Sequence, residues 1–286
     1  MSVDTASYLD AAGQVHRPAT GPLRIVSLSP VLTELCLELE LGDVLVGRTE
    51  ACARKLDGLA GVTSVGRPDA LKYDRIAELT PSHILLNLDD LPAGGIEKLR
   101  EAGGNRVAIR PCAPNDNFDL FRMLGDIFNV ASAADTLSRR FEAALARLKM
   151  AMREKSLLRA LYLVDRDPWR VAATGSYIAG LLDMAGFVVV SAPDSAETGE
   201  SNSPKRYPAV ELGEGLLKSI DAVLLDGGDG KFRRSDLKRF SEAHGVDRAK
   251  LHYLETSVAD WYGARAISAM DDLMTLRRSV EGSDAA

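Results

Sequence analysis

The sequence has few cysteines, no long apolar run and no excess of positive charge. Its three cysteines, Cys36, Cys52 and Cys112, are too few and odd in number for a disulfide framework. No stretch of about 18 apolar residues occurs, so no transmembrane helix is predicted. A net charge of −6 argues against non-specific nucleic-acid binding, because phosphate contacts need a basic surface. We therefore expect a soluble monomer with neither a nucleic-acid partner nor a membrane-embedded segment.

The N-terminal residues lack the features of an export signal. Residues 1–22 form a polar leader without a basic start, an apolar core or a cleavage site. The small number of cysteines also suits a reducing compartment. The sequence as written predicts a cytoplasmic location, and a periplasmic one if a signal peptide has been removed.

Catalytic and metal-binding motifs are also absent. The glycines at 227–230 lack the GxxxxGK[ST] pattern of a phosphate loop and are typical of a turn. Ser176 lacks the GxSxG pattern of a hydrolase nucleophile. The four histidines, His16, His83, His244 and His252, share no metal-ligand spacing. We assign no catalytic residue and expect a binding protein rather than an enzyme.

Short apolar segments alternate with helical patterns along most of the chain. Strands are expected at 24–28, 45–47, 83–88, 107–110, 159–164, 187–190, 222–225 and 251–254. Helices are expected at 30–42, 72–79, 93–104, 117–128, 176–185, 211–218, 235–242 and 261–278, and an irregular loop at 61–70. This alternation predicts an α/β fold with helices packed on parallel sheets.

One long helix is expected to connect two lobes. In residues 133–155 the large apolar residues recur at steps of four, four, three and four, at Leu137, Phe141, Leu145, Leu148 and Met152. The helix would be roughly 35 Å long. The predicted parts are a leader (1–22), an N-terminal lobe (23–130), the connecting helix (131–156) and a C-terminal lobe (157–286). The layout of residues 73–88 recurs in residues 210–227, which supports two related lobes.

Several motifs resemble a known family. RIVSLSPVLTELCLELELGDVLVGRTEAC, at 24–52, resembles the opening of class III periplasmic-type substrate-binding proteins, which include cobalamin- and siderophore-binding proteins. RDPWRVAATGSYIAGLLDMAGF and ADWYGAR, at 166–187 and 259–265, resemble the helical-backbone metal receptor branch, many members of which lack an export signal. The resemblance covers residues 24–278. It implies two Rossmann-like α/β lobes joined by one long backbone helix, with a ligand cleft between the lobes.

The resemblance also implies a function. Such a protein holds a corrinoid or another metal chelate, as a ligand rather than a cofactor, and presents it to an ABC-type permease. Glu78 and Glu211 or Glu214 correspond to carboxylates that dock on permease arginines. The alternative is a cytoplasmic metal-handling protein or enzyme that uses Cys52 and Cys112 with Asp89 and Asp90.

Loops that follow parallel strands meet at one edge of a sheet, so they contain the candidate ligand-binding residues. In the first lobe these are Ser29, Pro30, Glu50, Cys52, Asp89, Asp90 and Cys112. Two thiols and two carboxylates suit a borderline metal, although a free cysteine is equally typical of a core. In the second lobe they are Trp169, Tyr177, Arg206, Tyr207, Trp261, Tyr262 and Arg265. Aromatic rings with arginines suit a large planar ligand with acidic or amide groups, and core packing of these rings is the alternative.

Overall fold

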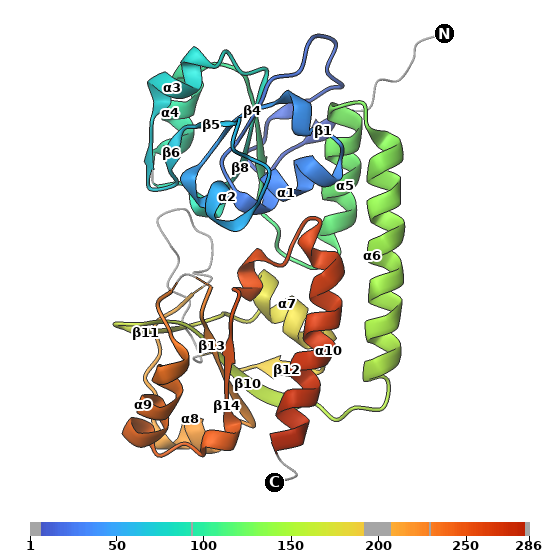
Figure 1. Ribbon diagram of the computed structural model, residues 1–286. Coiled ribbons are helices and arrows are strands. Elements are labelled where there is room, and N and C mark those ends of the chain that lie inside the picture. The colour runs from blue at the N-terminus through green and yellow to red at the C-terminus, as the bar shows by residue number, and fades with distance from the viewer. Residues whose placement is uncertain (1–6, 93, 192–206, 229, 284–286) are drawn as a thin grey trace. The chain divides into compact units, whose positions relative to one another are not determined.

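The computed structural model describes residues 7–92, 94–191, 207–228 and 230–283, which form two compact units (Figure 1). Unit 1 comprises Met1–Pro111, Asn115–Glu142 and Tyr262–Ala266. Unit 2 comprises Cys112–Pro114, Ala143–Trp261 and Ile267–Ala286. Each unit contains a largely parallel sheet with helices, so the predicted α/β fold is confirmed. In the part of the chain described, no helix is both long and apolar enough to cross a membrane.

The sheet of unit 1 has five parallel strands in the order β5-β4-β3-β8-β9. The strands are β3 (Ile25–Ser27), β4 (Leu45–Arg48), β5 (Thr63–Ser64), β8 (His83–Asn87) and β9 (Asn105–Ile109). The helices are α1 (Pro30–Glu38), α2 (Glu50–Lys55), α3 (Tyr73–Glu78), α4 (Gly95–Glu101) and α5 (Asp116–Ile127), with 3₁₀ turns η1 (Gly42–Val44) and η2 (Leu88–Asp90). Every residue of β8 is buried, which explains its continuous apolar run. The core beside it includes Val26, Ile76 and Leu99.

Two segments of unit 1 differ from the sequence prediction. The leader contains a hairpin of β1 (Tyr8–Leu9) and β2 (Val15–His16). The prediction of an irregular loop at 61–70 is wrong. This segment contains β5 and begins a second hairpin, formed by β6 (Gly66–Arg67) and β7 (Ala70–Leu71). Gly66 has a φ of 97°, and a Cβ there would lie 2.6 Å from the Ala70 carbonyl oxygen. Glycine therefore permits this tight hairpin, whose strands are too short to leave a periodic signal.

The sheet of unit 2 is built around β10. Its strands are β10 (Leu158–Arg166), β11 (Trp169–Val171), β12 (Phe187–Val189), β13 (Ala222–Asp226) and β14 (Leu251–Leu254). The order is β11-β10-β13-β14, with β12 also paired to β10, and β11 alone is antiparallel among these pairings. The helices are α7 (Tyr177–Met184), α8 (Glu214–Lys218) and α9 (Arg234–His244), with a 3₁₀ turn η3 (Arg248–Lys250). Strand β11 was not predicted from the sequence.

The two segments with a similar layout, residues 73–88 and 210–227, contain strands at corresponding positions in the two sheets. Strand β8 pairs with β3 and β9, and β13 pairs with β10 and β14, so each is an interior strand. Both strands are buried along their whole length, and each follows a short helix, α3 or α8. The repeated layout therefore marks the same structural position in each sheet.

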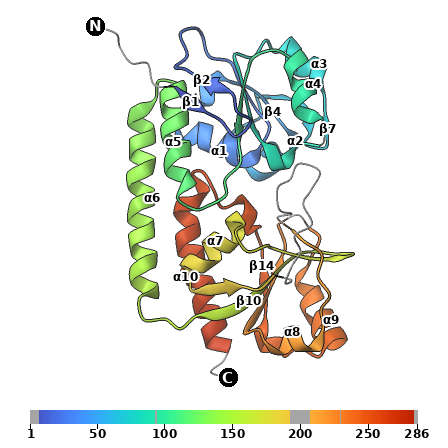
Figure 2. The ribbon, with the colours of Figure 1, turned by 180° about the vertical axis from the view of Figure 1, so that it is seen from behind.

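Two long helices belong to both units. Helix α6 (Ala131–Met152) is continuous, and its predicted stripe is buried at Leu137, Phe141, Leu145 and Leu148. Because the unit boundary follows Glu142, the stripe contributes to two cores. Helix α10 (Arg265–Ser283) lies beside α6 in both ribbon views (Figures 1 and 2), and Lys155 and Glu281 form an ion pair of 2.8 Å. It begins four residues later than predicted, after a 3₁₀ turn η4 (Val258–Asp260).

Candidate functional site

Three polar residues meet at the carboxyl edge of the unit 1 sheet. Ser29 follows β3, and its Oγ lies 3.3 Å from the hydroxyl oxygen of Tyr262. Asn87, the last residue of β8, donates from Nδ2 to the same hydroxyl at 3.2 Å. The Tyr262 segment is fixed by Asn117, whose Oδ1 accepts from the Gly263 amide at 2.7 Å. Ser29 and Tyr262 are thus brought together as site candidates, and Asn87 is a third member that the sequence did not single out.

The next strand ends provide a charged pair. Asp89 Oδ1 lies 3.1 Å from Arg110 Nε, which links the segments after β8 and β9. Both side chains are exposed, as is Asp90. Sequence analysis identified the two carboxylates but not Arg110. Asp89 is therefore compensated by a cation of the neighbouring strand.

Cys52 has the surroundings of a core cysteine. It is fully buried, with Sγ 3.1 Å from Thr49 Oγ1 and 3.2 Å from Thr33 Oγ1. Burial, and then the nearby Cys52, raise the pKa of Cys36 to about 12. Cys112 is exposed and belongs to unit 2. Over the described ranges, no three His, Cys, Asp or Glu side chains gather into a group that could hold a metal ion.

The remaining candidates of unit 1 lie at helix starts. Pro30 and Glu50 are the first residues of α1 and α2, and both are half-buried. Arg265 begins α10 and is also half-buried. Burial raises the pKa of Glu34 on α1, and the positive charge of Arg265 opposes this rise. Because Trp261 and Tyr262 precede α10, the prediction that they open this helix is wrong.

The aromatic candidates of unit 2 are packed within the unit. The ring of Trp169 is parallel to that of Phe232 to within 9°, with centroids 6.3 Å apart, and meets Phe240 edge-on at 5.5 Å. The Tyr177 hydroxyl donates to the Trp261 carbonyl oxygen at 2.8 Å. Trp261 and Tyr177 are both 4% exposed. These contacts show core packing for these three side chains.

Two further candidates lie on the loop before α8. The Tyr207 carbonyl oxygen accepts from Arg170 Nη1 at 3.0 Å, and the Tyr207 side chain is half-buried. Arg206 lies outside the described residues. The Tyr207 carbonyl oxygen thus links this loop to β11.

A buried carboxylate that sequence analysis missed organises the carboxyl edge of the unit 2 sheet. Asp226 ends β13 and accepts from the Tyr162 hydroxyl at 2.9 Å and from Ser257 Oγ at 2.7 Å. Burial, and then the charge of Asp226, raise the pKa of Tyr162 well above its usual value. At Gly228 a Cβ would lie 2.3 Å from the Ser257 amide nitrogen. Glycine is therefore required at 228 because the backbone of Ser257 comes so close, and not because the loop binds a phosphate.

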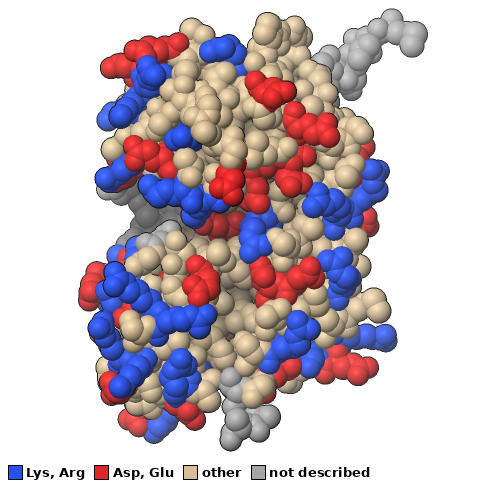
Figure 3. Space-filling model, in the orientation of Figure 1, with Lys and Arg blue, Asp and Glu red and all other residues tan. Residues whose placement is uncertain are grey.

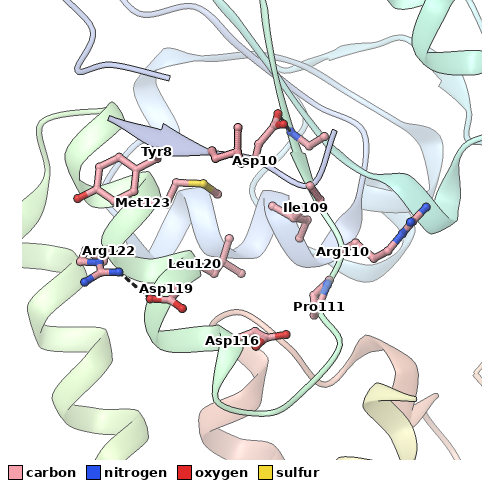
Figure 4. Close-up of a pocket in the computed structure, with 13 residues that line it drawn as sticks. Tyr8, Asp10, Ile109, Arg110, Pro111, Asp116, Asp119, Leu120, Arg122 and Met123 are labelled. Carbon is pink, nitrogen blue, oxygen red and sulfur yellow. Dashed lines mark hydrogen bonds and ion pairs between the residues drawn. The ribbon is translucent and has the colours of Figure 1, made fainter. Parts of the chain in front are cut away.

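A cavity of about 310 Å³ lies in unit 1 between the N-terminal hairpin, the end of β9 and α5 (Figure 4). Leu9, Ile109, Leu120 and Met123 form much of its wall. A second cavity, of about 560 Å³, is lined by residues 15–23 and by Ser82, His83 and Asn105. None of the predicted site residues lines either cavity.

Exposed glutamates were expected to dock on a permease. Glu78 ends α3 and pairs with Arg75 at 2.9 Å, Glu211 is exposed, and Glu214 pairs with Lys218 at 2.5 Å. On the face shown in Figure 3, acidic and basic side chains are interspersed over both units. All three glutamates are thus on the surface, as a docking role requires.

A family model described as a periplasmic binding protein matches residues 25–238. The chain belongs to this family. Its role is that of a substrate-binding protein for a small ligand, and the family resemblance seen in the motifs is confirmed. The family name refers to the periplasm, so the cytoplasmic location expected from the sequence gains no support.

Solved structures share the fold of this periplasmic binding protein. The vitamin B12-binding protein BtuF of Vibrio cholerae is 20% identical, with a TM-score of 0.66 over 90% of this chain and 97% of that one. The heme-binding protein RhuT of Roseiflexus sp. RS-1 is 19% identical, with a TM-score of 0.70 over 92% and 99%. A periplasmic binding protein of Veillonella parvula is 17% identical, with a TM-score of 0.74 over 97% and 98%. No curated protein matches the sequence.

Proposed function

We propose that this protein binds a corrinoid or a similar metal chelate at the loops after the carboxyl ends of its parallel strands, and delivers it in the periplasm to an ABC-type permease. The observation that carries the proposal is the family match over residues 25–238. Vitamin B12 and heme, which two structural relatives are named for binding, are both metal ions held in large planar rings. Because two proteins with this fold bind ligands of similar shape, we expect this protein to bind a planar metal chelate as well.

Buried polar groups hold the carboxyl edge of unit 1 together. Ser29, Asn87 and Tyr262 are 2%, 8% and 3% exposed, and their side chains bond to one another from three separate segments. They would keep the loops of this edge in position around the rim of a macrocycle. The packed aromatic residues Trp169, Tyr177 and Trp261 would then act by shaping the loops rather than by stacking on the ligand.

The alternative metal-handling role has less support. It requires Cys52 as a ligand, and this thiol is enclosed by two threonine hydroxyls. Asp89, its proposed partner, is already paired with Arg110. The chelate-binding function is therefore preferred.

An absorbance titration tests the proposal. The purified protein is titrated with cyanocobalamin, dicyanocobinamide, hemin and ferric siderophores, while tryptophan fluorescence is followed in parallel. We expect saturable one-to-one binding of at least one chelate, with a micromolar or lower Kd, and no response to the free metal ions. Absence of binding across the panel would refute the proposed function.

Two tyrosine variants locate the site. Tyr262→Phe removes the hydroxyl shared by Ser29 and Asn87, and should weaken chelate binding by about tenfold, because the loops of this edge lose a hydrogen bond that positions them. Tyr253→Phe is the matched control, because its hydroxyl donates to the Phe232 carbonyl oxygen within unit 2. Equal affinities of the two variants would place the ligand away from Tyr262.

Docking is tested separately from chelate binding. Replacing both Glu78 and Glu211 with Gln should leave the chelate Kd unchanged and weaken binding to the permease in proteoliposomes. Glu214→Gln, on the same exposed surface as Glu211, shows which of the two residues of unit 2 is used. Unchanged permease binding in all variants would assign docking to other residues.

A further inference from the structure

Arg48 differs from its neighbours at the carboxyl edge of unit 1 in having almost no partners. It is the last residue of β4, in register with Ser27 of β3 and Ser64 of β5. Its side chain is half-buried, and its buried Nε has no hydrogen-bond partner among the residues that the structure describes. Nη1 makes one long contact of 3.5 Å with the Thr49 carbonyl oxygen. Arg48 forms no ion pair with any carboxylate of the described residues.

Such a group is costly unless something else binds it. A guanidinium has five donors and stays charged at any physiological pH, so burying it without an anion is unfavourable. Buried polar groups in native proteins are nearly always bonded, and an exception calls for an explanation.

Other arginines of the same unit show that the fold satisfies guanidinium groups elsewhere. Arg24, at the amino end of β3, donates from Nε and Nη2 to the Leu79 carbonyl oxygen at 2.9 and 2.8 Å. Arg110, at the carboxyl edge, is paired with Asp89. Arg48 is the exception among these three, and it lies at the edge where ligands of open parallel sheets bind.

We propose that Arg48 receives an acidic group of the ligand, so that the chelate bound by this protein carries a carboxylate or a phosphate. The inference rests on the proposed function, because it requires a ligand at this edge. The planar fork of a guanidinium matches both groups with two parallel hydrogen bonds. A ligand anion would supply the charge compensation that no carboxylate of the described chain gives to Arg48.

The first test needs no ligand. Urea unfolding is measured for Arg48→Gln and for Arg24→Gln, which removes two hydrogen bonds to the Leu79 carbonyl oxygen at the opposite end of the same sheet. Arg24→Gln should lower the unfolding midpoint, whereas Arg48→Gln should leave it unchanged or raise it. A loss in Arg48→Gln equal to that in Arg24→Gln would show that Arg48 has a structural role, and would overturn the inference.

The second test compares ligands with and without acidic groups. Hemin is paired with hemin dimethyl ester, which lacks free carboxylates, and cyanocobalamin with dicyanocobinamide, which lacks the phosphodiester. Arg48→Gln should weaken binding of the acidic member of the bound pair at least tenfold and leave its neutral counterpart unchanged. Arg24→Gln should change neither. Equal effects on both members would overturn the inference while leaving the proposed function intact.

A third measurement separates this inference from the proposed function. If no chelate binds the wild type, the proposed function fails, and citrate and inorganic phosphate become the probes. The Nε–H signal of Arg48, assigned by its absence in Arg48→Gln, is followed by nitrogen-15 NMR during titration with each anion. A saturable shift supports an anion site at Arg48, and an unmoved signal overturns it.

Discussion

His83 is a buried histidine at the start of β8, an interior strand of unit 1. It is 5% exposed, its Nδ1 lies 3.0 Å from Ser82 Oγ, and its ring meets Phe128 edge-on at 5.1 Å. Burial, and then the charge of His16, lower the pKa of His83 to about 4. The folded protein therefore holds this ring neutral under conditions in which an unfolded chain would begin to protonate it.

The stability of the protein should consequently fall on mild acidification. Because the folded pKa of His83 is below the unfolded value of about 6.5, its contribution is present above pH 6.5 and is lost as the pH falls towards 4. A shift of this size corresponds to about 3 kcal/mol. Urea unfolding at pH 7 and pH 4.5 measures the loss, and His83→Gln should show a smaller difference between the two pH values. An unchanged difference would assign the acid sensitivity to other groups.

Residue by residue, sequence reasoning found some site members and missed others for a common reason. Ser29 was found because it follows a clear strand, and Tyr262 because a family motif contains it. The sequence did not single out Asn87, Asp226 or Arg48, because each looks like an ordinary strand end. Asn87 and Asp226 matter through partners that are distant in the sequence, and Arg48 matters because its Nε has no partner in the described ranges. For Trp169 the residue type indicated a ligand contact, whereas the structure shows packing on Phe232.

Among the elements, the N-terminal hairpin depends on one side chain. Asp10 is 6% exposed and accepts from the amides of Ala12 and Gln14 at Oδ1, and from the Ala108 amide and His16 Nε2 at Oδ2. The hydrogen bonds from His16 and the backbone amides lower the pKa of Asp10 against the opposing effect of burial. The carboxylate thus closes the hairpin and attaches it to the outer edge of β9.

Asp10→Asn should detach the hairpin without unfolding the unit. The side-chain amide of asparagine replaces one acceptor oxygen with a donor. The buried Ala108 amide or the His16 ring then loses its acceptor, at a cost of about 2 kcal/mol. Hydrogen exchange at the Ala108 amide should become faster by roughly tenfold or more. Asp57→Asn, at an exposed loop position, is the control and should leave this exchange unchanged. Continued protection of Ala108 in Asp10→Asn would show that other contacts hold the hairpin.

At the scale of the whole molecule, α6 contributes buried side chains to both cores. Phe141 packs against Phe118 and Phe121 in unit 1, with ring centroids 5.1 and 6.2 Å apart. Leu145 and Leu148 are buried in the part of α6 that belongs to unit 2. Damage in the middle of this helix should therefore reach both units.

Ala146→Pro tests this sharing. Ala146 is exposed in the interior of α6, so proline removes a helix hydrogen bond and clashes with the preceding turn, at a cost of about 3 kcal/mol or more, while changing no buried side chain. Hydrogen exchange should speed up on both β8 and β13. Ala146→Gly, which costs about 1 kcal/mol, is the graded control. Faster exchange in only one unit would show that the other core does not depend on α6.

The sequence by itself determined the α/β alternation, the long shared helix and the family. Periodicity, apolar runs and local motifs are properties of neighbouring residues, so they can be read before the chain folds. Tertiary structure alone decided that Cys52 and Trp169 are packed, that the leader forms a hairpin on β9, and that Arg48 has no counter-ion in the described part of the chain. These outcomes depend on which distant groups meet at a sheet edge, and spacing along a single sequence does not contain that information.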